Sequence, residues 1–428
     1  MTASPESATE PAWYAAALRH CWRPYTQMKT AAPPLPVVAT RGSRIHLADG
    51  RELVDGIASW WTAVHGYNHP HILAAMKRQL EVMPHVMFGG LTHEPAARLA
   101  ARLAALAPGD LEHVFFAESG SVAVEVAIKM ARQYWLNQGE KRPKLLFFRG
   151  AYHGDTFATM AISDPEEGMH RLFAGMLEEH VLAELPVDEA GTAALDSLLE
   201  RHAPQLAAIV VEPLVQGASG MRMHAPETLQ RIRSAADRHG LLLIADEIFT
   251  GFGRTGTMFA CEQAGIVPDI MTVSKALTGG HAPLSAAIAR RHVFAAFLDE
   301  DPDKALMHGP TYMAYALGAA AANASLDLFA GADRLAQARA IEAAFREMLS
   351  DLAAAPPVVD LRIRGAIAAV ELAGDLAWTR DQITRAFLAR GVWLRPLERV
   401  IYLTPALTIP EADLARLLEA VRAVVRRL

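Results

Sequence analysis

The chain has 428 residues, of which 52% are hydrophobic, 21% are charged and 7% are aromatic. This composition is typical of a globular protein and excludes a disordered or fibrous one, and the length suits one large domain with smaller lobes. The formal net charge of −6, from 41 basic and 47 acidic residues, and the lack of a long basic run exclude nucleic acid as an expected partner.

The start of the sequence and its cysteines bear on where the protein resides. Residues 1–10 are polar and acidic and lack the basic start and apolar centre of a signal peptide. Apolar runs fall short of the roughly 20 residues that span a bilayer. Cys21 and Cys261 are far apart and follow no disulfide or metal-site spacing. We therefore expect a cytoplasmic protein that binds neither a membrane nor a metal ion.

The N-terminal part of the chain is predicted to form a small antiparallel lobe. Residues 11–22 have a helical pattern. Further along, Asp49 and Gly50 lie between two alternating runs of apolar and polar residues, which is typical of a β-hairpin. We assign residues 1–64 to this lobe.

From residue 65 onward, helical stretches at 69–83 and 94–106 are followed by short apolar runs. Each run is apolar throughout and bounded by polar or turn residues, as expected for strands with helices on both faces. These runs cover residues 113–117, 144–150, 207–213, 241–247, 269–275 and 284–289. The pattern predicts an α/β fold with a mostly parallel, doubly wound sheet in a large domain of residues 65–325.

The last part of the chain has a different pattern. A helical stretch is followed by strand-like runs at 360–372, 392–397 and 400–407, and the chain closes with an amphipathic helix. This order predicts a smaller α+β domain over residues 326–428.

Two charged residues stand at predicted strand ends, where α/β sheets place their ligands. Asp246 is a buried carboxylate that needs a cationic partner, such as a protonated pyridine nitrogen; the alternatives are a helix cap or an ion pair with Arg254. Lys275 lies among apolar and small residues, where burial lowers its pKa and favours a neutral amine that attacks an aldehyde; the alternative is a solvated charge. An aspartate and a lysine are the two groups that pyridoxal phosphate requires.

Three further strand ends carry candidate ligands. Gly120 and Ser121 open a helix after a strand, so they suit a phosphate, although such a turn is more often a simple N-cap. Tyr152, followed by His153, can lie flat against a planar ring or can only fill space. Glu212 is a carboxylate that we place beside the phenolic oxygen of the ring.

These strand ends together resemble those of fold-type I pyridoxal-phosphate enzymes and, among them, the class III aminotransferases. The resemblance runs over nearly the whole chain, in the segments WRPYTQM, SWWTAVHGYNHP, HVMFGGLTHEPA, ESGSVAVEVAIKMARQYW, MHGPTYM and VWLRPLERVIYL. It implies a seven-stranded sheet, a smaller lobe formed by both termini, pyridoxal 5′-phosphate as cofactor and aminotransferase activity. It also implies that Lys275 forms the Schiff base and acts as the catalytic base.

The resemblance implies roles for individual residues as well. Gly120 and Ser121 hold the phosphate, while Pro310 and Thr311 reach it from the other subunit of a homodimer. Arg395 pairs with a substrate carboxylate, for which a planar guanidinium is suited. Tyr25 is expected to take part in catalysis beside Lys275 and Asp246. The substrate pocket is lined by aromatic and small residues, namely Tyr25, Trp60, Trp61, Tyr152, Gly309 and Tyr402.

The same segments most resemble the branch of the family that serves biotin synthesis. This resemblance implies 8-amino-7-oxononanoate as the amine acceptor and S-adenosylmethionine as the donor. The chain departs from the expected pattern at His281 and at Ala314, Tyr315 and Ala316, which bear on the choice of donor. The alternatives are another class III ω-aminotransferase that uses lysine or alanine with pyruvate, and a phosphate-binding α/β module without catalysis.

Overall fold

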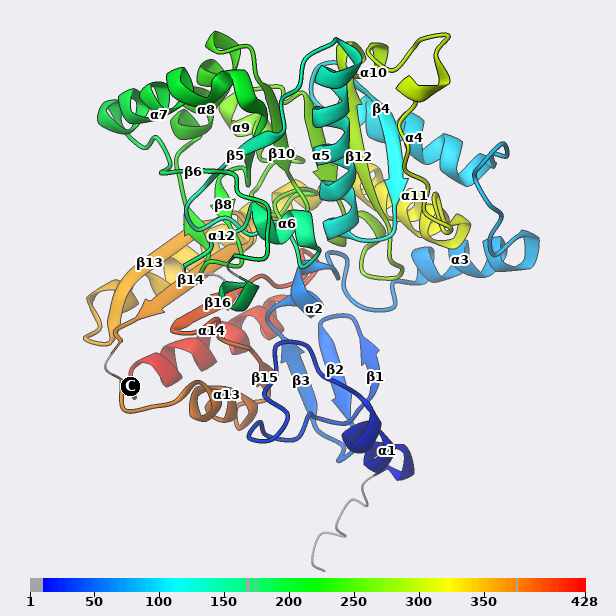
Figure 1. The fold of residues 1–428 in the computed structure, drawn as a ribbon. Coiled ribbons are helices and arrows are strands. Elements are labelled where there is room, and N and C mark those ends of the chain that lie inside the picture. Colours follow the sequence, from blue (N-terminus) through cyan, green and yellow to red (C-terminus); the bar gives the residue numbers. More distant parts are fainter. Residues whose placement is uncertain (1–10, 167–169, 174, 375) are drawn as a thin grey trace, which may run out of the picture.

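The computed structural model describes residues 11–166, 170–173, 175–374 and 376–428 (Figure 1). The prediction about residues 1–10 lies outside the described residues. A large α/β domain fills the upper part of Figure 1, and the N-terminal segment in blue and the C-terminal segment in orange and red both lie below it. In the described parts of the chain, no helix has the length and apolar character needed to cross a bilayer.

The large domain is built on a seven-stranded sheet with the strand order β4-β12-β11-β10-β7-β5-β6. The strands are β4 (Leu111–Ala117), β5 (Lys144–Phe148), β6 (Val181–Ala183), β7 (Leu206–Val211), β10 (Leu242–Asp246), β11 (Ile270–Val273) and β12 (Ser285–Arg290). Neighbouring strands are parallel except on the two sides of β12. The prediction of a mostly parallel sheet is confirmed. The sequence does not predict β6, because its three residues are too few for a pattern.

The helices of the large domain cover both faces of this sheet, except α3, which packs against α11. They are α3 (Pro70–Val82), α4 (Glu94–Leu106), α5 (Gly120–Asn137), α6 (Phe157–Ala161), α7 (Glu189–His202), α8 (Pro226–Arg238), α9 (Cys261–Ala264), α10 (Arg291–Ala295) and α11 (Ala316–Gly331). Val210 and Ile244 pack in one apolar cluster with α5, whereas Ile209 and Leu243 pack in another with α7 and α8. Because alternate residues of each strand are fixed in opposite layers, the strand ends are a rigid base for the residues that follow them.

The hairpin predicted at Asp49 and Gly50 is confirmed. β2 (Arg44–Leu47) and β3 (Glu52–Asp55) pair antiparallel across it, after helix α1 (Ala12–His20) and strand β1 (Val37–Arg41). The fourth strand of this sheet, β15 (Val392–Trp393), comes from the C-terminal region and runs parallel to β3. Both ends of the chain therefore build the smaller lobe, as the resemblance implied.

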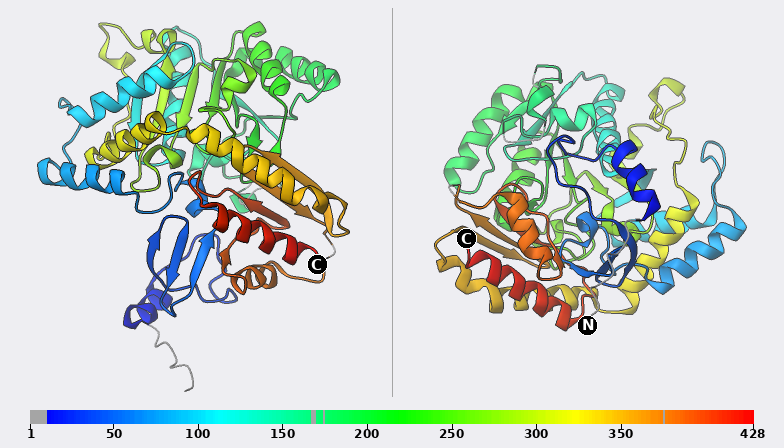
Figure 2. Two further views of the ribbon diagram at one scale, coloured as in Figure 1. Left: turned by 180° about the vertical axis from the view of Figure 1, so that it is seen from behind. Right: turned by 90° about the horizontal axis from the view of Figure 1, so that it is seen from below.

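The C-terminal region adds a three-stranded antiparallel sheet. Its strands are β13 (Val358–Arg364), β14 (Ile367–Leu372) and β16 (Val400–Leu403), and its helices are α12 (Arg334–Leu349), α13 (Arg380–Leu388) and α14 (Glu411–Val425). Figure 2 shows α14, in red, beside α12, in gold. The predicted boundary after residue 325 falls inside α11, which packs against α3 and α4. The division of the chain at residues 64 and 325 stays a prediction.

Candidate active site

The strand ends singled out in the sequence surround one cavity of about 160 Å³. It lies beyond the carboxyl ends of β7, β10 and β11 and the start of α5. Its lining consists of Trp61, Gly120, Ser121, Tyr152, His153, Gly154, Glu212, Ala218, Asp246, Ile248, Phe249, Ser274 and Lys275. The structure thus brings together a lysine, two carboxylates and a helix N-terminus from segments far apart in the sequence.

Asp246 is buried at the end of β10, and its partner is a histidine. His153 Nδ1 lies 2.8 Å from Asp246 Oδ2, and the backbone N–H of Ile248 donates to Oδ1 at 3.1 Å. Burial lowers the pKa of His153, but the hydrogen bond to Asp246 and the charges of Asp246 and Glu212 outweigh it, so the pKa is raised. The alternative pair with Arg254 is wrong, because that guanidinium donates to the carbonyl oxygen of Pro405 at 2.7 Å.

Glu212 follows β7 and is a second buried carboxylate at the cavity. It accepts hydrogen bonds from the backbone N–H groups of Tyr152, at 3.1 Å, and Gly217, at 3.0 Å. Burial raises its pKa to about 7, although the nearby His153 charge acts in the opposite direction. Near neutral pH this carboxyl group can therefore either hold or release a proton.

Lys275 begins the short 3₁₀ helix Lys275–Thr278 directly after Ser274 and β11, with a left-handed φ of 42°. Its Nζ faces the cavity and lies 4.4 Å from the centroid of the Trp61 ring. Burial lowers its pKa to about 8, while the charges of Asp246 and Glu212 work to raise it. A substantial fraction of neutral amine is therefore present close to neutral pH, as a nucleophile requires.

The start of α5 fits a phosphate group. The first N–H groups of a helix have no intrahelical partner, and the helix dipole favours an anion there. Gly154 lets the facing loop approach, since a Cβ at this position would come within 2.2 Å of Ser121 Oγ. The same hydroxyl accepts a hydrogen bond from the Asp155 N–H at 3.2 Å. Gly120 and Ser121 thus form a narrow, polar end of the cavity.

The residues around the lysine suit a planar, protonated heterocycle as well as a phosphate. Asp246 offers a buried carboxylate, and Trp61 and Phe249 pack at 4.2 Å between ring centroids on the wall. Among the described residues, His153 Nε2 and Trp61 Nε1 are buried without a hydrogen-bond partner. The donor set therefore fits pyridoxal 5′-phosphate.

A cluster of polar residues at the edge of the cavity links Tyr25 to Tyr152. Their hydroxyl oxygens lie 3.3 Å apart. Both hydroxyl groups donate a hydrogen bond to the Asp155 carboxylate, and the bond from Tyr152 is 3.1 Å long. His170 Nε2 lies 3.0 Å from the same carboxylate, and its hydrogen bond holds the pKa of Asp155 below the usual value. Asp155 and His170 were not among the residues predicted from the sequence, although Asp155 stands in the HGDT segment that follows β5.

Trp60 and Trp61 belong to α2 (Ala58–Trp61), a short left-handed turn. The φ angles of its four residues are 45°, 47°, 55° and 75°, and each costs roughly 1–2 kcal/mol because the Cβ crowds the following carbonyl oxygen. Trp60 lies under Arg395, with 5.2 Å from Cζ to the ring centroid, and 6.3 Å from the Tyr25 ring. Trp61 contacts Tyr402, whose ring centroid is 6.3 Å away.

Several predicted site residues are not part of the cavity lining, among them Tyr25, Trp60, Arg395 and Tyr402. In the described chain, Gly309, Pro310 and Thr311 do not line it, and His85 Nε2 lies 3.1 Å from the Thr311 carbonyl oxygen. His281 follows the lysine loop, with Nδ1 at 2.9 Å from the Gly279 carbonyl oxygen. Ala314, Tyr315 and Ala316 form the entry to α11.

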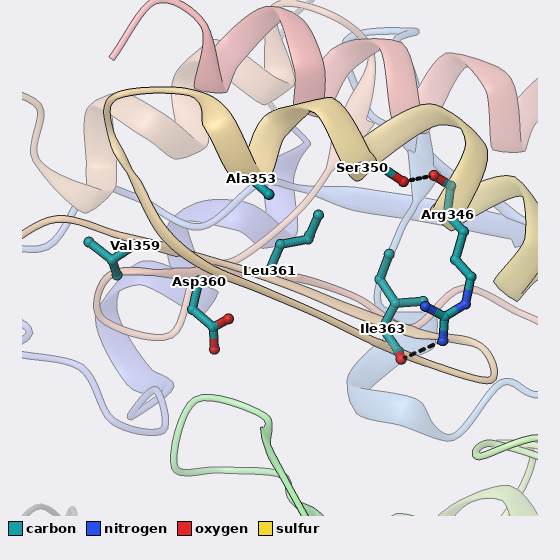
Figure 3. Close-up of a pocket in the computed structure, with 7 residues that line it drawn as sticks. All are labelled: Arg346, Ser350, Ala353, Val359, Asp360, Leu361 and Ile363. Atoms are coloured by element: carbon teal, nitrogen blue, oxygen red, sulfur yellow. Dashed lines mark hydrogen bonds between the residues drawn. The ribbon is translucent and has the colours of Figure 1, made fainter.

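A second hollow, of about 340 Å³, lies in the C-terminal region and has no comparable chemistry (Figure 3). It is bounded by the end of α12, the turn after it and β13. Its one arginine, Arg346, donates to the carbonyl oxygen of Ile363 at 3.2 Å and pairs with Glu342 at 2.6 Å. Asp360, which also lines the hollow, pairs with Arg362 at 2.5 Å. Because both charged groups already have partners of opposite charge, the hollow offers no ligand group like those around Lys275.

The fold and the Lys275 cavity together define a fold-type I pyridoxal-phosphate-dependent transferase. The family described as Aminotransferase class-III matches residues 25–425. The chain belongs to the class III aminotransferases and is an aminotransferase with pyridoxal 5′-phosphate as its cofactor. A solved amine transaminase from an uncultivated Pseudomonas species in its PLP-bound form has 30% identity and a TM-score of 0.88, covering 95% of this chain and 98% of that one.

Two curated relatives share a more specific name. Adenosylmethionine-8-amino-7-oxononanoate aminotransferase of Mycobacterium leprae is 45% identical over 94% of each chain. The enzyme of that name from Synechococcus elongatus is 42% identical over 94% of this chain and 97% of its own. The crystal structure of the Methanocaldococcus jannaschii enzyme of that name has a TM-score of 0.92 and 30% identity, covering 97% of this chain and 98% of that chain.

Proposed function

We propose that this aminotransferase moves an amino group from S-adenosylmethionine to 8-amino-7-oxononanoate and so makes 7,8-diaminononanoate in biotin biosynthesis. The observation that carries the proposal is the name shared by relatives that are 42–45% identical over nearly their full length. A function in a biosynthetic pathway of this kind is consistent with a cytoplasmic protein.

The residues at the entrance of the cavity suit an amine acceptor that carries a carboxylate at the end of an aliphatic chain. Trp60 and Tyr25 form an aromatic wall that suits methylene groups. Arg395 lies over that wall and is proposed to bind the carboxylate through two parallel hydrogen bonds. Tyr152 and Tyr402, which flank the two tryptophans and Tyr25, are proposed to complete the pocket.

Lys275 is the proposed catalytic lysine. When bound, pyridoxal 5′-phosphate supplies an aldehyde carbon that takes up the amine and a ring that accepts an electron pair from the substrate carbon. Lys275 Nζ is proposed to hold that aldehyde carbon covalently at rest. Once the donor amine has displaced it, the free Lys275 amine would accept a proton from the donor carbon and return it to the former aldehyde carbon, on the other side of the transferred nitrogen. In the cofactor-free protein, burial lowers the pKa of this amine to about 8, which favours its neutral form.

The two carboxylates are proposed to control protons on the cofactor ring. Asp246, held by His153 at 2.8 Å, keeps a proton at the ring nitrogen because an ionised carboxylate stabilises the cation. Glu212, with a pKa raised to about 7, exchanges a proton with the phenolic oxygen. Tyr25 is proposed to orient the substrate amine through its hydroxyl group, which Asp155 holds.

The phosphate site is proposed to be completed by a second copy of the chain. Gly120 and Ser121 supply one side, and Pro310 and Thr311, with Gly309 beside them, supply the other from the partner subunit. The segment around them exposes large apolar side chains, with Met307 73% and Tyr312 53% exposed, which is characteristic of a surface that another chain covers. Sedimentation of the cofactor-loaded protein is expected to give a dimer; a stable, active monomer would contradict this assignment.

A donor panel tests the proposed reaction. The loaded enzyme is mixed with 8-amino-7-oxononanoate and, in separate reactions, S-adenosylmethionine, lysine or alanine, and 7,8-diaminononanoate is measured by mass spectrometry. We expect product with S-adenosylmethionine at a rate well above the rates with lysine and alanine. Equal or faster formation with lysine or alanine would overturn the choice of donor.

The second candidate is an ω-aminotransferase that takes another donor. A solved (S)-enantioselective omega-transaminase from Thermomicrobium roseum favours it, with 30% identity, a TM-score of 0.89 and coverage of 97% of each chain. The discriminating reaction uses a simple amine with pyruvate and measures alanine. Rapid alanine formation, together with no diaminononanoate from any donor, would select this candidate.

A further inference from the structure

A buried carboxylate lies beneath the left-handed turn α2 and has no part in the reaction described so far. Asp55, the last residue of β3, is 2% exposed. Its Oδ1 accepts a hydrogen bond from the Ile57 N–H at 2.8 Å, and its Oδ2 accepts one from the Ser59 N–H at 2.9 Å. The carboxylate therefore caps the first N–H groups of the turn.

A tyrosine completes this system from the other side. The Tyr67 hydroxyl group donates to Asp55 Oδ2 at 2.5 Å and lies 2.5 Å from Ser59 Oγ. The backbone of Tyr67 is itself fixed, because it exchanges N–H···O bonds with Gly42 at 2.7 and 3.2 Å. Asp55 at the end of β3 and Tyr67, which is bonded to Gly42, are thus two anchors for the turn.

The turn needs such anchors because each of its four residues carries a Cβ in the left-handed region. Its own bonds come mainly from the residues that follow it: Trp61 N–H donates to the Ile57 carbonyl oxygen and Thr62 N–H to that of Ala58, both at 2.9 Å, Ala63 N–H donates to Ala58 at 3.1 Å, and the Thr62 hydroxyl group donates to the Ser59 carbonyl oxygen at 3.0 Å. The contacts to Asp55 and Tyr67 therefore oppose relaxation toward an ordinary backbone conformation, which would shift the positions of the two tryptophan rings.

The turn places two consecutive rings against two charged groups of the site. The Trp61 ring lies 4.4 Å from Lys275 Nζ, and the Trp60 ring lies 5.2 Å from the Arg395 guanidinium carbon. Figure 1 shows α2 between the N-terminal sheet and the large domain. We propose that Asp55 and Tyr67 are positioning residues that hold α2 left-handed and thereby set Trp60 and Trp61 against Arg395 and Lys275.

Tyr67→Phe tests this proposal, because it removes both hydroxyl contacts and keeps the aromatic ring. We expect KM for 8-amino-7-oxononanoate to rise about tenfold, the effect of losing one hydrogen bond to a charged group, while kcat changes less than about threefold. The pH midpoint of the absorption band of the Lys275-bound cofactor is expected to fall by about half a unit, because the Trp61 ring no longer stabilises the protonated nitrogen.

A pair of substitutions at Ser59 separates backbone conformation from loss of the hydroxyl group. Ser59→Gly and Ser59→Ala both remove Oγ, but only glycine adopts the left-handed φ of 47° without a steric cost. In the Tyr67→Phe background, we expect Ser59→Gly to restore KM and the spectral midpoint at least partly and Ser59→Ala to restore neither. Asp55→Asn serves as a second background in which the same ordering is expected.

The proposal is overturned if Tyr67→Phe and Asp55→Asn both leave KM and the spectral midpoint unchanged, or if the glycine and alanine variants behave alike. Only the KM measurement rests on the proposed function, because it uses 8-amino-7-oxononanoate as the substrate. The spectral midpoint does not depend on the substrate, so glycine-specific recovery of that midpoint supports the proposal even if the donor panel fails.

Discussion

Replacing His153 with asparagine tests how the buried Asp246 carboxylate is stabilised. His153 Nδ1 lies 2.8 Å from Asp246 Oδ2, and both side chains are buried. Asparagine keeps a side-chain N–H donor but cannot carry a positive charge. A charged partner strengthens a hydrogen bond from about 0.5–1.5 to about 1.5–3 kcal/mol. Because asparagine keeps the bond and loses only the charge of the donor, we expect the cofactor-free variant to lose about 1 kcal/mol of unfolding free energy at mildly acidic pH, where the histidine is charged.

The loss of unfolding free energy in this variant is expected to depend on pH. The pKa of His153 is raised in the folded protein, since the Asp246 hydrogen bond and the charges of both carboxylates outweigh burial. A raised folded-state pKa means that the contribution is fully present below the unfolded value of about 6.5 and is lost as the pH rises through the folded value. Urea unfolding of both proteins at equal concentration, from about pH 5.5 to about pH 9, measures the difference. It should shrink with rising pH, and a difference that stays constant or grows would refute the reasoning.

Three further predictions concern the lysine and the arginine. Lys275→Ala is expected to lower kcat by at least about 10²-fold, and borohydride reduction followed by peptide mass spectrometry should find no cofactor attached at that position. In the cofactor-free protein, the Lys275 amine should react with an aldehyde at a rate that rises with pH and levels off above about 8, following its lowered pKa; a midpoint near the ordinary lysine value would contradict the role of burial. Arg395→Gln should raise KM for a carboxylate substrate about tenfold to a hundredfold while thermal stability changes little, and an equal loss with an amine that has no carboxylate would argue against the ion pair.

The residues that the sequence predicted well are those that follow a strand directly. Asp246 ends β10, Lys275 comes two residues after β11, and Glu212 follows β7. An apolar run is a local pattern, and parallel strands end at one edge of a sheet, so residues after such runs converge without any knowledge of long-range contacts. Glu212, Asp246 and Lys275 indeed line one cavity.

The features that the sequence did not predict depend on contacts between distant segments. His153 was noted only as a neighbour of Tyr152, because nothing local shows that it meets Asp246, which is 93 positions away. The left-handed turn at Ser59 and Trp60 contains no glycine, so backbone preference argues against it. Tertiary contacts from Asp55 and Tyr67 override that preference, and such contacts become visible only in the folded chain.

The residues of the site are therefore held in place by two different parts of the fold, the large sheet and the small lobe. Lys275, Asp246 and Glu212 are fixed by one sheet whose strands are packed on both faces, whereas Trp60 and Arg395 come from segments on either side of the large domain in the sequence. The Arg395 guanidinium carbon lies 5.2 Å from the centroid of the Trp60 ring. This contact depends on the pairing of β3 with β15 in the small lobe, because β3 precedes the turn that carries Trp60 and β15 precedes Arg395. With Trp60 and Arg395 as the proposed substrate contacts, substrate choice would change through the small lobe while the residues on the sheet stay the same, in keeping with one fold shared by transaminases that have different names.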